Sequence, residues 1–560
     1  METYTVMLIV IICLGLVLTK LENRRTSGKR IGDKVRESYG KIPSPGEVDF
    51  SLLEYSWVFD REKVPEHEQI DEITWNDLDM DSVFCRIDSC QSFAGQQVLY
   101  GALHCQAKAE EQGERLKEKI LFFAQNEEER QRVMMILARL GKGRDSYYLP
   151  AFVHNLKGFE IPNIRFYHMM RALLFLSLIP AAVLLQSQLL VLTLFAAMAN
   201  LTIYSFQKYK YSVNLSMLRS VLGIVRTARQ ISDGGKSGYE TRFRDLADLA
   251  RPFERAILKM AKLQRRDQEG LAGDMFSMLG AYFIGVTLSD FIQYNQLLKE
   301  LNGKQQELLE LYHRVGEVDM SIAAASFRAS LPHWCVPETV RSGGIQVEDI
   351  YHPLIKDPVC NSVTLERGCL ITGSNASGKS TFIKSLAVNV LLAQSICTCA
   401  AGRMRLPAAS LVTSMAVRDD VTSGESYYIK EIKYLKRIIR QLDSERFTIC
   451  VIDEILRGTN TQERIAASCA VLKYLAGQNC LAVTASHDIE LTQLLADYYD
   501  NYHFREQMEE NGISYTYKIQ PGPADSKNAI RLLEIMGFPG EIVEEARMVT
   551  RTWAGVMDGT

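Results

Sequence analysis

Gly373-Ser-Asn-Ala-Ser-Gly-Lys-Ser380 has the spacing of a phosphate-binding loop. An apolar run, residues 369–372, precedes the loop and a helix-like segment follows it, as this pattern requires. Glycines let backbone N–H groups approach phosphate oxygens, the lysine reaches the β- and γ-phosphates, and the last serine binds Mg²⁺. The sequence therefore predicts a nucleoside triphosphate site. The expected contacts are Gly373, Asn375, Gly378, Lys379, Ser380 and Thr381.

Two further apolar runs end in residues suited to hydrolysis. Residues 447–452 resemble a buried parallel strand and are followed by Asp453 and Glu454. We expect Asp453, with Ser380, to hold Mg²⁺, and Glu454 to orient and deprotonate the attacking water. Residues 480–484 form a third such run, and His487 after it is placed to sense the γ-phosphate. Glu454 and His487 are therefore the candidate catalytic residues.

Four motifs in this order resemble the ATPase domain of the MutS family of DNA mismatch-repair proteins. They are the phosphate loop, Asp419-Asp420-Val-Thr-Ser423-Gly424-Glu-Ser426, Asp453-Glu-Ile-Leu-Arg-Gly-Thr-Asn460 and Thr484-Ala-Ser-His487. The resemblance implies an ABC-type ATPase that uses ATP with Mg²⁺ and forms a homodimer. It also implies that Ser423, Gly424 and Ser426 of one subunit reach the γ-phosphate held by the other. Leu456 stands where better-known members have glycine.

A weaker likeness to the same family extends upstream to about residue 75. Residues 77–103 and 316–338 resemble the two ends of the family's helical core domain, and residues 515–548 resemble its closing segment. Before residue 75 there is no room for the family's mismatch-reading and connector domains. The letters Phe504-Arg-Glu506 match the lesion-reading element, but they follow the third ATPase strand, where we expect an edge strand. We therefore interpret that match as coincidence.

The chain begins with a segment suited to a membrane anchor. Residues 4–19 are nearly all apolar, and Lys20, Arg24, Arg25, Lys29 and Arg30 follow. Positive charge on that side predicts that the rest of the chain faces the cytoplasm. A cleaved signal peptide is the alternative, although the first residues are not basic and no small-residue cleavage site precedes the basic cluster.

A second apolar region, residues 172–206, carries no charged side chain. Its length suits two short membrane spans joined near residues 186–188, and basic residues flank it on both sides. Two spans would leave the ATPase domain on the cytoplasmic face of the cytoplasmic membrane, with the lipid bilayer as a partner. The alternative is a buried helix pair of a soluble protein. Residues 278–288 are shorter and lie between Asp274 and Asp290, which favours a buried core helix.

Charge and cysteine content add little to these motifs. The net charge of −3 gives no overall attraction to nucleic acid. Residues 211–270 hold twelve Lys or Arg against seven Asp or Glu, which favours a topology signal or anionic-lipid contact over DNA phosphates. The twelve cysteines are scattered without a Cys-x-x-Cys pair, so neither a zinc site nor a disulfide framework is indicated.

The sequence thus predicts a multidomain protein with an α-helical core/lever domain, transmembrane helices and an α/β P-loop ATPase domain of the ABC type. The expected order is an anchor at 1–19, a linker at 20–74, the helical domain at 75–334 interrupted by the hairpin 172–206, and the ATPase at 335–560. Two functions remain open. One is a membrane-anchored MutS-like ATPase that couples ATP to DNA binding in mismatch repair or a related process. The other is a membrane ATPase acting on a lipid or protein partner without DNA.

Overall fold

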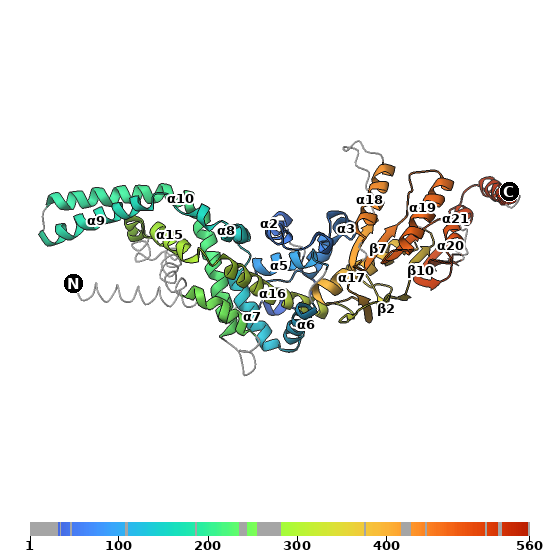
Figure 1. The fold of residues 1–560 in the computed structure, drawn as a ribbon, viewed down its shortest axis with the longest axis horizontal. Helices are drawn as coiled ribbons and strands as arrows, with labels where there is room; N and C mark the ends of the chain where they lie inside the picture. Colours follow the sequence, from blue (N-terminus) through green and yellow to red (C-terminus); the bar gives the residue numbers. More distant parts are fainter. Residues whose placement is uncertain are drawn as a thin grey trace. The chain divides into compact units, whose positions relative to one another are not determined.

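The computed structural model describes residues 32–33, 35–44, 48–106, 110–184, 187–233, 243–254, 282–374, 377–415, 427–442, 445–509, 512–524 and 529–557 (Figure 1). The chain divides into two compact units. A helical unit comprises the described residues within Met1–Lys63, Ile87–Gly101 and Glu118–Ser330, and a sheet unit comprises those within Val64–Arg86, Ala102–Lys117 and Leu331–Thr560. The predicted anchor at 1–19 lies outside the described residues.

The helical unit is built around one long buried helix, α16 (Gln305–Ala329). Its apolar side chains, such as Leu311 and Val315, are fully buried because other helices surround it. Asp319 of α16 is also fully buried, and its carboxylate accepts hydrogen bonds from the backbone N–H groups of Gln91 and Ser92. The other main helices of this unit are α2 (Phe50–Arg61), α5 (Phe93–Leu103), α7 (Glu127–Leu140), α8 (Leu149–His154), α12 (Arg244–Ala250) and α15 (Ser289–Leu301).

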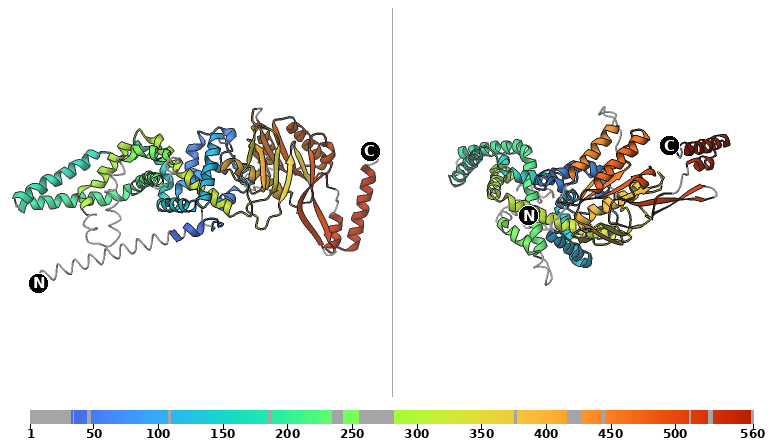
Figure 2. Two further views of the ribbon diagram at one scale, coloured as in Figure 1. Left: turned by 90° about the horizontal axis from the view of Figure 1, so that it is seen from below. Right: turned by 45° about the vertical axis from the view of Figure 1, so that its right-hand side comes forward.

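Two helices of this unit form a hairpin. Its part nearest the turn projects away from the other helices, and the later part of its second helix packs against α7, α12 and α16. α9 (Ile164–Leu184) and α10 (Ser187–Ser232) lie side by side in the views of Figures 1 and 2. α9 ends at Leu184 and α10 begins at Ser187, next to the junction predicted near residues 186–188, but α10 continues far beyond residue 206 as one helix. Among the described residues, Gln188–Ser232 is a segment long and apolar enough to cross a membrane, and only 17% of its most apolar section is buried.

Most of the hairpin's apolar side chains face outward. A buried helix pair of a soluble protein would cover these side chains with other parts of the chain. Because they are exposed here, the chain by itself does not form such a buried pair. Within residues 164–206, the large side chains that are at least one third exposed are Phe166, Met169, Leu173, Phe175, Leu176, Leu178, Ile179, Val183, Leu184, Leu190, Val191, Leu192, Leu194, Phe195, Met198 and Phe206.

The described part of the predicted buried helix at 278–288 packs against this hairpin with one side only. Ile284 and Leu288 are buried, whereas Tyr282 and Phe283 are more than half exposed. Asn200 of α10 is fully buried, and its side-chain amide donates to the Val286 carbonyl at 2.7 Å. The described part of the segment expected as a buried core helix is therefore buried on one side and exposed at Tyr282 and Phe283.

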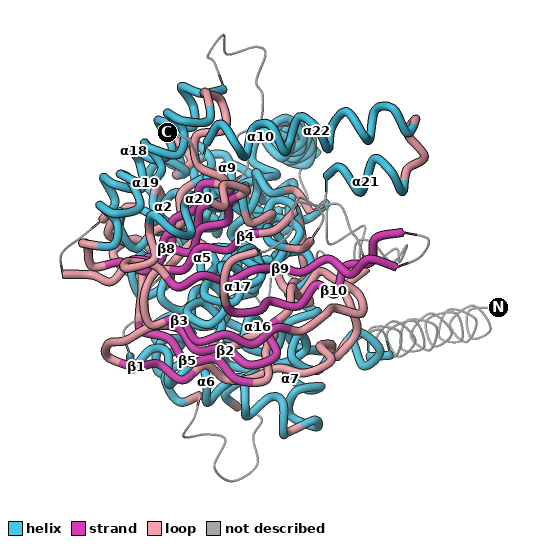
Figure 3. Tube along the Cα trace, turned by 90° about the vertical axis from the view of Figure 1, so that its right-hand side faces the viewer, coloured by secondary structure: helices cyan, strands magenta, loops and turns pink. Residues whose placement is uncertain are grey.

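The sheet unit contains a six-stranded sheet in the order β10-β9-β4-β8-β7-β6. All strands are parallel except β10 (Figure 3). Their bounds are β4 (Cys369–Thr372), β6 (Ser410–Ser414), β7 (Thr448–Asp453), β8 (Cys480–Ser486), β9 (Asp500–Glu509) and β10 (Gly512–Pro521). α17 (Lys379–Ile396), α18 (Tyr427–Gln441) and α19 (Thr461–Ala476) pack on this sheet. The central strands are buried along almost their whole length because both of their faces are covered.

A second, four-stranded sheet has the order β1-β5-β2-β3. Its strands are β1 (Glu338–Val340), β2 (Ile345–Ile350), β3 (Asn361–Leu365) and β5 (Arg403–Pro407). The chain closes with α21 (Ala529–Ile535) and α22 (Gly540–Met557). Phe504 lies on β9, the second strand from the edge rather than the expected edge strand, and its buried ring packs 5.9 Å from that of Phe382. It is a core residue beside the phosphate loop.

The sheet unit includes two segments from earlier in the chain, residues 64–86 and 102–117. α3 (Glu72–Asp77) packs beside the edge strand β6, where the Asp77 carboxylate accepts from the Thr413 hydroxyl at 2.7 Å and the Met415 N–H at 3.0 Å. Asp71 forms an ion pair with Arg437 of α18 at 3.0 Å. These contacts cover a strand edge that would otherwise be open to pairing. The compact sheet unit therefore includes residues 64–86 and 102–117 in addition to a C-terminal part that begins at Leu331, close to the expected boundary at residue 335.

Candidate nucleotide site

Strand register brings the three predicted motifs to one edge of the six-stranded sheet. Thr372 at the end of β4 pairs with Ser486 of β8, and Asp453 at the end of β7 pairs with Ala485. The Glu454 N–H donates to the Ala485 carbonyl at 2.9 Å, which extends this pairing by one residue. Because ligands of open parallel sheets bind beyond the carboxyl ends of the strands, this edge is the expected nucleotide site.

Two glycines shape the loop that follows β4. Gly373 and Gly378 have φ values of 141° and 105°, which favour glycine. A Cβ atom at Gly373 would lie 2.9 Å from the Phe504 carbonyl oxygen, and one at Gly378 would lie 3.1 Å from the Tyr517 ring. Any larger residue would therefore widen the loop. Asn375, the remaining predicted loop contact before Gly378, lies outside the described residues.

Lys379 is the first residue of α17 and is almost completely buried. Its ammonium group donates to the carbonyls of Gly373 at 2.6 Å and Ser374 at 2.7 Å, so the charge lies inside the loop. The amino-terminal end of α17 adds the positive field of the helix dipole at the same place. Thr381 lies in the first turn of α17 and is exposed. The loop can therefore stabilise a bound phosphate.

Asp453 and Ser380 form the predicted metal-binding pair. Burial raises the pKa of Asp453, while a hydrogen bond with the Ser380 side chain acts in the opposite direction. Two buried oxygen atoms, Asp453 Oδ1 and Ser374 Oγ, have no hydrogen-bond partner among the described residues. A cation beside Asp453 and a phosphate oxygen beside Ser374 would supply those partners. The residues present therefore fit a nucleotide with Mg²⁺.

Glu454 is held by two neighbouring side chains. Its Oε1 lies 2.7 Å from Nε2 of His487, and its other oxygen forms an ion pair with Arg457. Burial alone would raise the pKa of Glu454, but the hydrogen bond and charge of His487, with the charges of Arg457 and Lys379, hold it below its usual range. Glu454 is thus ionised and oriented near neutral pH. The sequence predicted a phosphate sensor at His487, and the structure adds a direct contact with the candidate base.

A second ion pair, absent from the sequence predictions, fixes the residue next to His487. Arg464 of α19 binds the Asp488 carboxylate with two hydrogen bonds, of 2.9 and 2.6 Å. This bidentate geometry restrains the loop that carries His487. The two residues are 24 positions apart and belong to no spacing pattern, so only the fold brings them together.

Glu454 and Leu456 have left-handed backbone conformations, with φ values of 59° and 57°. Such values are uncommon for residues other than glycine and cost free energy. Leu456 nevertheless buries its side chain, which is 5% exposed, in the cluster that contains Leu435 and Ile452. Glycine, which better-known members of the resembling family have at position 456, would adopt this conformation without strain.

The remaining predicted contacts come from the segment 416–426. Ser423, Gly424 and Ser426 lie outside the described residues, so their predicted action on a partner's nucleotide stays a prediction. Within the part of the chain that the structure describes, no group of three or more His, Cys, Asp or Glu side chains could hold a metal ion.

Comparisons with known proteins agree with this site. Residues 369–553 match the family model of MutS domain V. The DNA mismatch repair protein MutS of Desulfitobacterium hafniense is 29% identical over 280 residues, which cover 47% of this chain and 32% of that protein. The protein of that name from Pseudothermotoga lettingae is 30% identical over 46% of this chain and 33% of its own length. MutS protein homolog 4 of Mus musculus is 30% identical over 46% and 28%. The chain thus spans about a third of the length of these relatives.

Proposed function

We propose that this chain, which belongs to the MutS family through its C-terminal domain, is a membrane-attached ATP hydrolase with ATP at a dimer interface. The observation that carries the proposal is the contact between Glu454 and His487 at the sheet edge that also holds Lys379 and Asp453. A carboxylate held ionised beside a buried phosphate-loop lysine is arranged for water activation next to a phosphoryl group.

Each residue has a distinct task in this proposal. Lys379 and the loop N–H groups bind the phosphates, and Ser380 with Asp453 would hold Mg²⁺, which neutralises phosphate charge when bound. Glu454 accepts the proton of the attacking water. His487 orients the Glu454 carboxylate and lies where it can contact the γ-phosphate.

The dimer is proposed from the family resemblance, with Ser423, Gly424 and Ser426 acting on the partner's nucleotide. Complementation between two inactive variants tests it. Lys379→Ala should lose ATP binding, and Ser426→Ala should bind ATP without efficient hydrolysis. A mixed dimer would contain one site with both functional residues, so mixing should restore up to about a quarter of wild-type turnover, as random pairing dictates. No recovery on mixing, with mixed dimers demonstrated by pull-down, would contradict action across the interface.

The exposed hairpin supports membrane attachment. Residues 188–206 of α10 extend for about 28 Å at about 1.5 Å per residue, close to the ~30 Å hydrocarbon core of a bilayer. Basic residues lie at both chain ends of the apolar region, namely Arg165, Arg171, Lys208 and Lys210. That arrangement supports a topology in which both ends of the hairpin lie on the cytoplasmic side. The proposed location is the cytoplasmic membrane with the ATPase domain in the cytoplasm.

DNA is the proposed partner of the ATP cycle, and the names of the relatives, DNA mismatch repair proteins, support it. The second candidate is a lipid or protein partner without DNA. It is favoured by the hairpin, whose exposed side chains are apolar, whereas DNA phosphates attract Lys and Arg. ATP turnover of the full chain in lipid nanodiscs, with and without duplex, branched and mismatched DNA, distinguishes the two. Stimulation that falls with salt supports DNA, and turnover indifferent to every DNA supports the second candidate.

A further inference from the structure

A cavity of about 690 Å³ lies at the base of the hairpin, where α9 begins. Its walls come from the loop before α9, from the first turns of α9 and from α15. The side chains that matter here are Glu160, Arg165, Phe166, Met169, Asn295 and Lys299. All of them belong to the helical unit.

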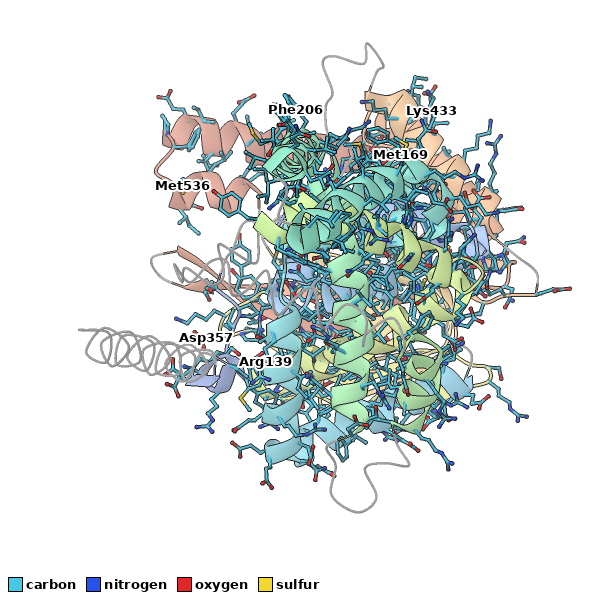
Figure 4. All side chains as sticks on the ribbon, turned by 90° about the vertical axis from the view of Figure 1, so that its left-hand side faces the viewer. Arg139, Met169, Phe206, Asp357, Lys433 and Met536 are labelled. Carbon is cyan, nitrogen blue, oxygen red and sulfur yellow. The ribbon has the colours of Figure 1, made fainter. Side chains whose placement is uncertain are left out.

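The cavity has a charged part and an apolar part. Arg165 and Lys299 contribute cations from two different helices, and Glu160 contributes one carboxylate. Phe166 and Met169 are 43% and 60% exposed, and they continue into the apolar surface of the hairpin. Met169 and Phe206 are labelled on this hairpin in Figure 4. A ligand that fits both parts carries a negative charge and an apolar chain.

The wall opposite the hairpin is held in place by hydrogen bonds. Asn295 of α15 is buried, and its side-chain oxygen accepts the Ile161 N–H at 2.9 Å. The Tyr294 hydroxyl donates to the Phe159 carbonyl at 3.0 Å. These bonds tie the loop before α9 to α15. Because the wall is already fixed, little ordering would oppose binding.

The cavity also lies where a membrane surface is expected. Aromatic and basic side chains collect at membrane–water interfaces. Phe206 and Tyr209 of α10 are 77% and 89% exposed, and Lys208 lies between them in the sequence. These residues lie where the apolar surface of the hairpin ends and charged side chains begin.

We propose that this cavity binds the headgroup of an anionic phospholipid. The lipid phosphate contacts Arg165 and Lys299, and an acyl chain lies along Phe166 and Met169. Glu160 opposes a bare polyanion such as DNA and can accept hydrogen bonds from the hydroxyls of a headgroup such as phosphatidylglycerol. The inference rests on the proposed membrane attachment and gives it a lipid preference.

Native mass spectrometry of the full chain, released from nanodiscs of phosphatidylcholine with a minority of phosphatidylglycerol, tests the site. The wild-type chain should retain phosphatidylglycerol, and Arg165→Gln with Lys299→Gln should reduce its retention about 25-fold. That estimate takes roughly fivefold per cation near an anionic lipid surface. Arg171→Gln with Lys210→Gln makes the same charge change outside the cavity and should retain the lipid. Equal retention by the cavity variant, or equal loss in the control, would overturn the proposal.

Two further measurements separate this inference from membrane attachment itself. Both double variants should float with phosphatidylcholine vesicles, because the apolar hairpin is unchanged. Failure of the wild-type chain to float would refute membrane attachment rather than the headgroup site alone. Inorganic phosphate at millimolar concentration should not displace the retained lipid, since it lacks the acyl chain. Complete displacement would identify a free-anion site and overturn the lipid assignment.

Discussion

Replacing Leu456 by glycine and by alanine should reverse the usual order of stability of these two residues. Leu456 has a φ of 57° and a side chain that is 5% exposed. Both variants lose the packing of the leucine side chain, which costs about 2–5 kcal/mol in a protein core. Only glycine removes the backbone strain of the left-handed conformation. The two variants therefore differ in the backbone contribution and in the one methyl group that alanine keeps.

The expected difference follows from two opposing effects. A left-handed conformation costs a residue with a Cβ atom about 1–2 kcal/mol. Glycine avoids that cost, but it lowers the free energy of unfolding by about 0.4–1 kcal/mol because it increases the conformational entropy of the unfolded chain. The glycine variant should therefore be more stable than the alanine variant by about 1 kcal/mol. At an ordinary position in a regular element, alanine is the more stable of the two.

Pulse proteolysis of the full chain in detergent, across a urea series, measures this difference. The fraction of intact sheet unit is followed on a gel, so unfolding elsewhere does not enter the comparison. With a urea dependence of about 1–3 kcal/mol per molar, the glycine variant should unfold at about 0.3–1 M more urea than the alanine variant. A higher midpoint for the alanine variant would refute the assigned backbone conformation of Leu456.

Three further results are expected. Replacing His487 by asparagine removes the hydrogen bond and charge that hold the pKa of Glu454 low. The acid limb of the pH–kcat profile should therefore move to higher pH. An acid limb at the wild-type pH would contradict the contact between His487 and Glu454. Replacing Arg464 by methionine frees the loop that carries His487, so ATP turnover should fall several-fold at unchanged ATP affinity, and only a change in affinity without a change in kcat would contradict a positioning role. Burial raises the pKa of Asp319 from its ordinary 3.8 to about 6, so the folded state binds more protons than the unfolded state between those values. Stability of the helical unit should therefore fall by roughly 3 kcal/mol as pH rises from about 3 to about 7, and this slope, followed by urea unfolding, should disappear in Asp319→Asn.

The nucleotide site could be predicted from the sequence because its functional residues stand in local sequence patterns. The loop glycines, Lys379 and the Asp453-Glu454 pair each sit at the end of a short apolar run, and parallel strands bring such ends to one edge. The ion pair between Arg464 and Asp488 was not accessible, since neither residue stands in a recurring spacing. The conformation of Leu456 was not predicted, although the glycine that better-known family members have at this position is a signal for a left-handed backbone.

The helical unit shows a different limit. The absence of charge predicted the two helices of the hairpin and the position of their turn, because a long uncharged run has few other structures. The basic residues after Phe206 suggested the end of a span, but α10 continues to Ser232. Charged residues end the apolar surface of a helix, but they do not by themselves end the helix. The packing of α3 on β6 depends on residues more than 300 positions apart, such as Asp77 and Thr413, which no local pattern connects.

ATP binding and ATP turnover of the Glu454→Gln variant, in the full chain in lipid nanodiscs, decide whether this site hydrolyses ATP as proposed. The amide keeps the size of the side chain but cannot accept the proton of the attacking water. The variant should bind ATP with a Kd close to that of the wild-type chain and hydrolyse it at least about 100-fold more slowly, the lower range for a general base. Turnover at the wild-type rate, with binding intact, would show that Glu454 is not the base and would contradict the proposed mechanism.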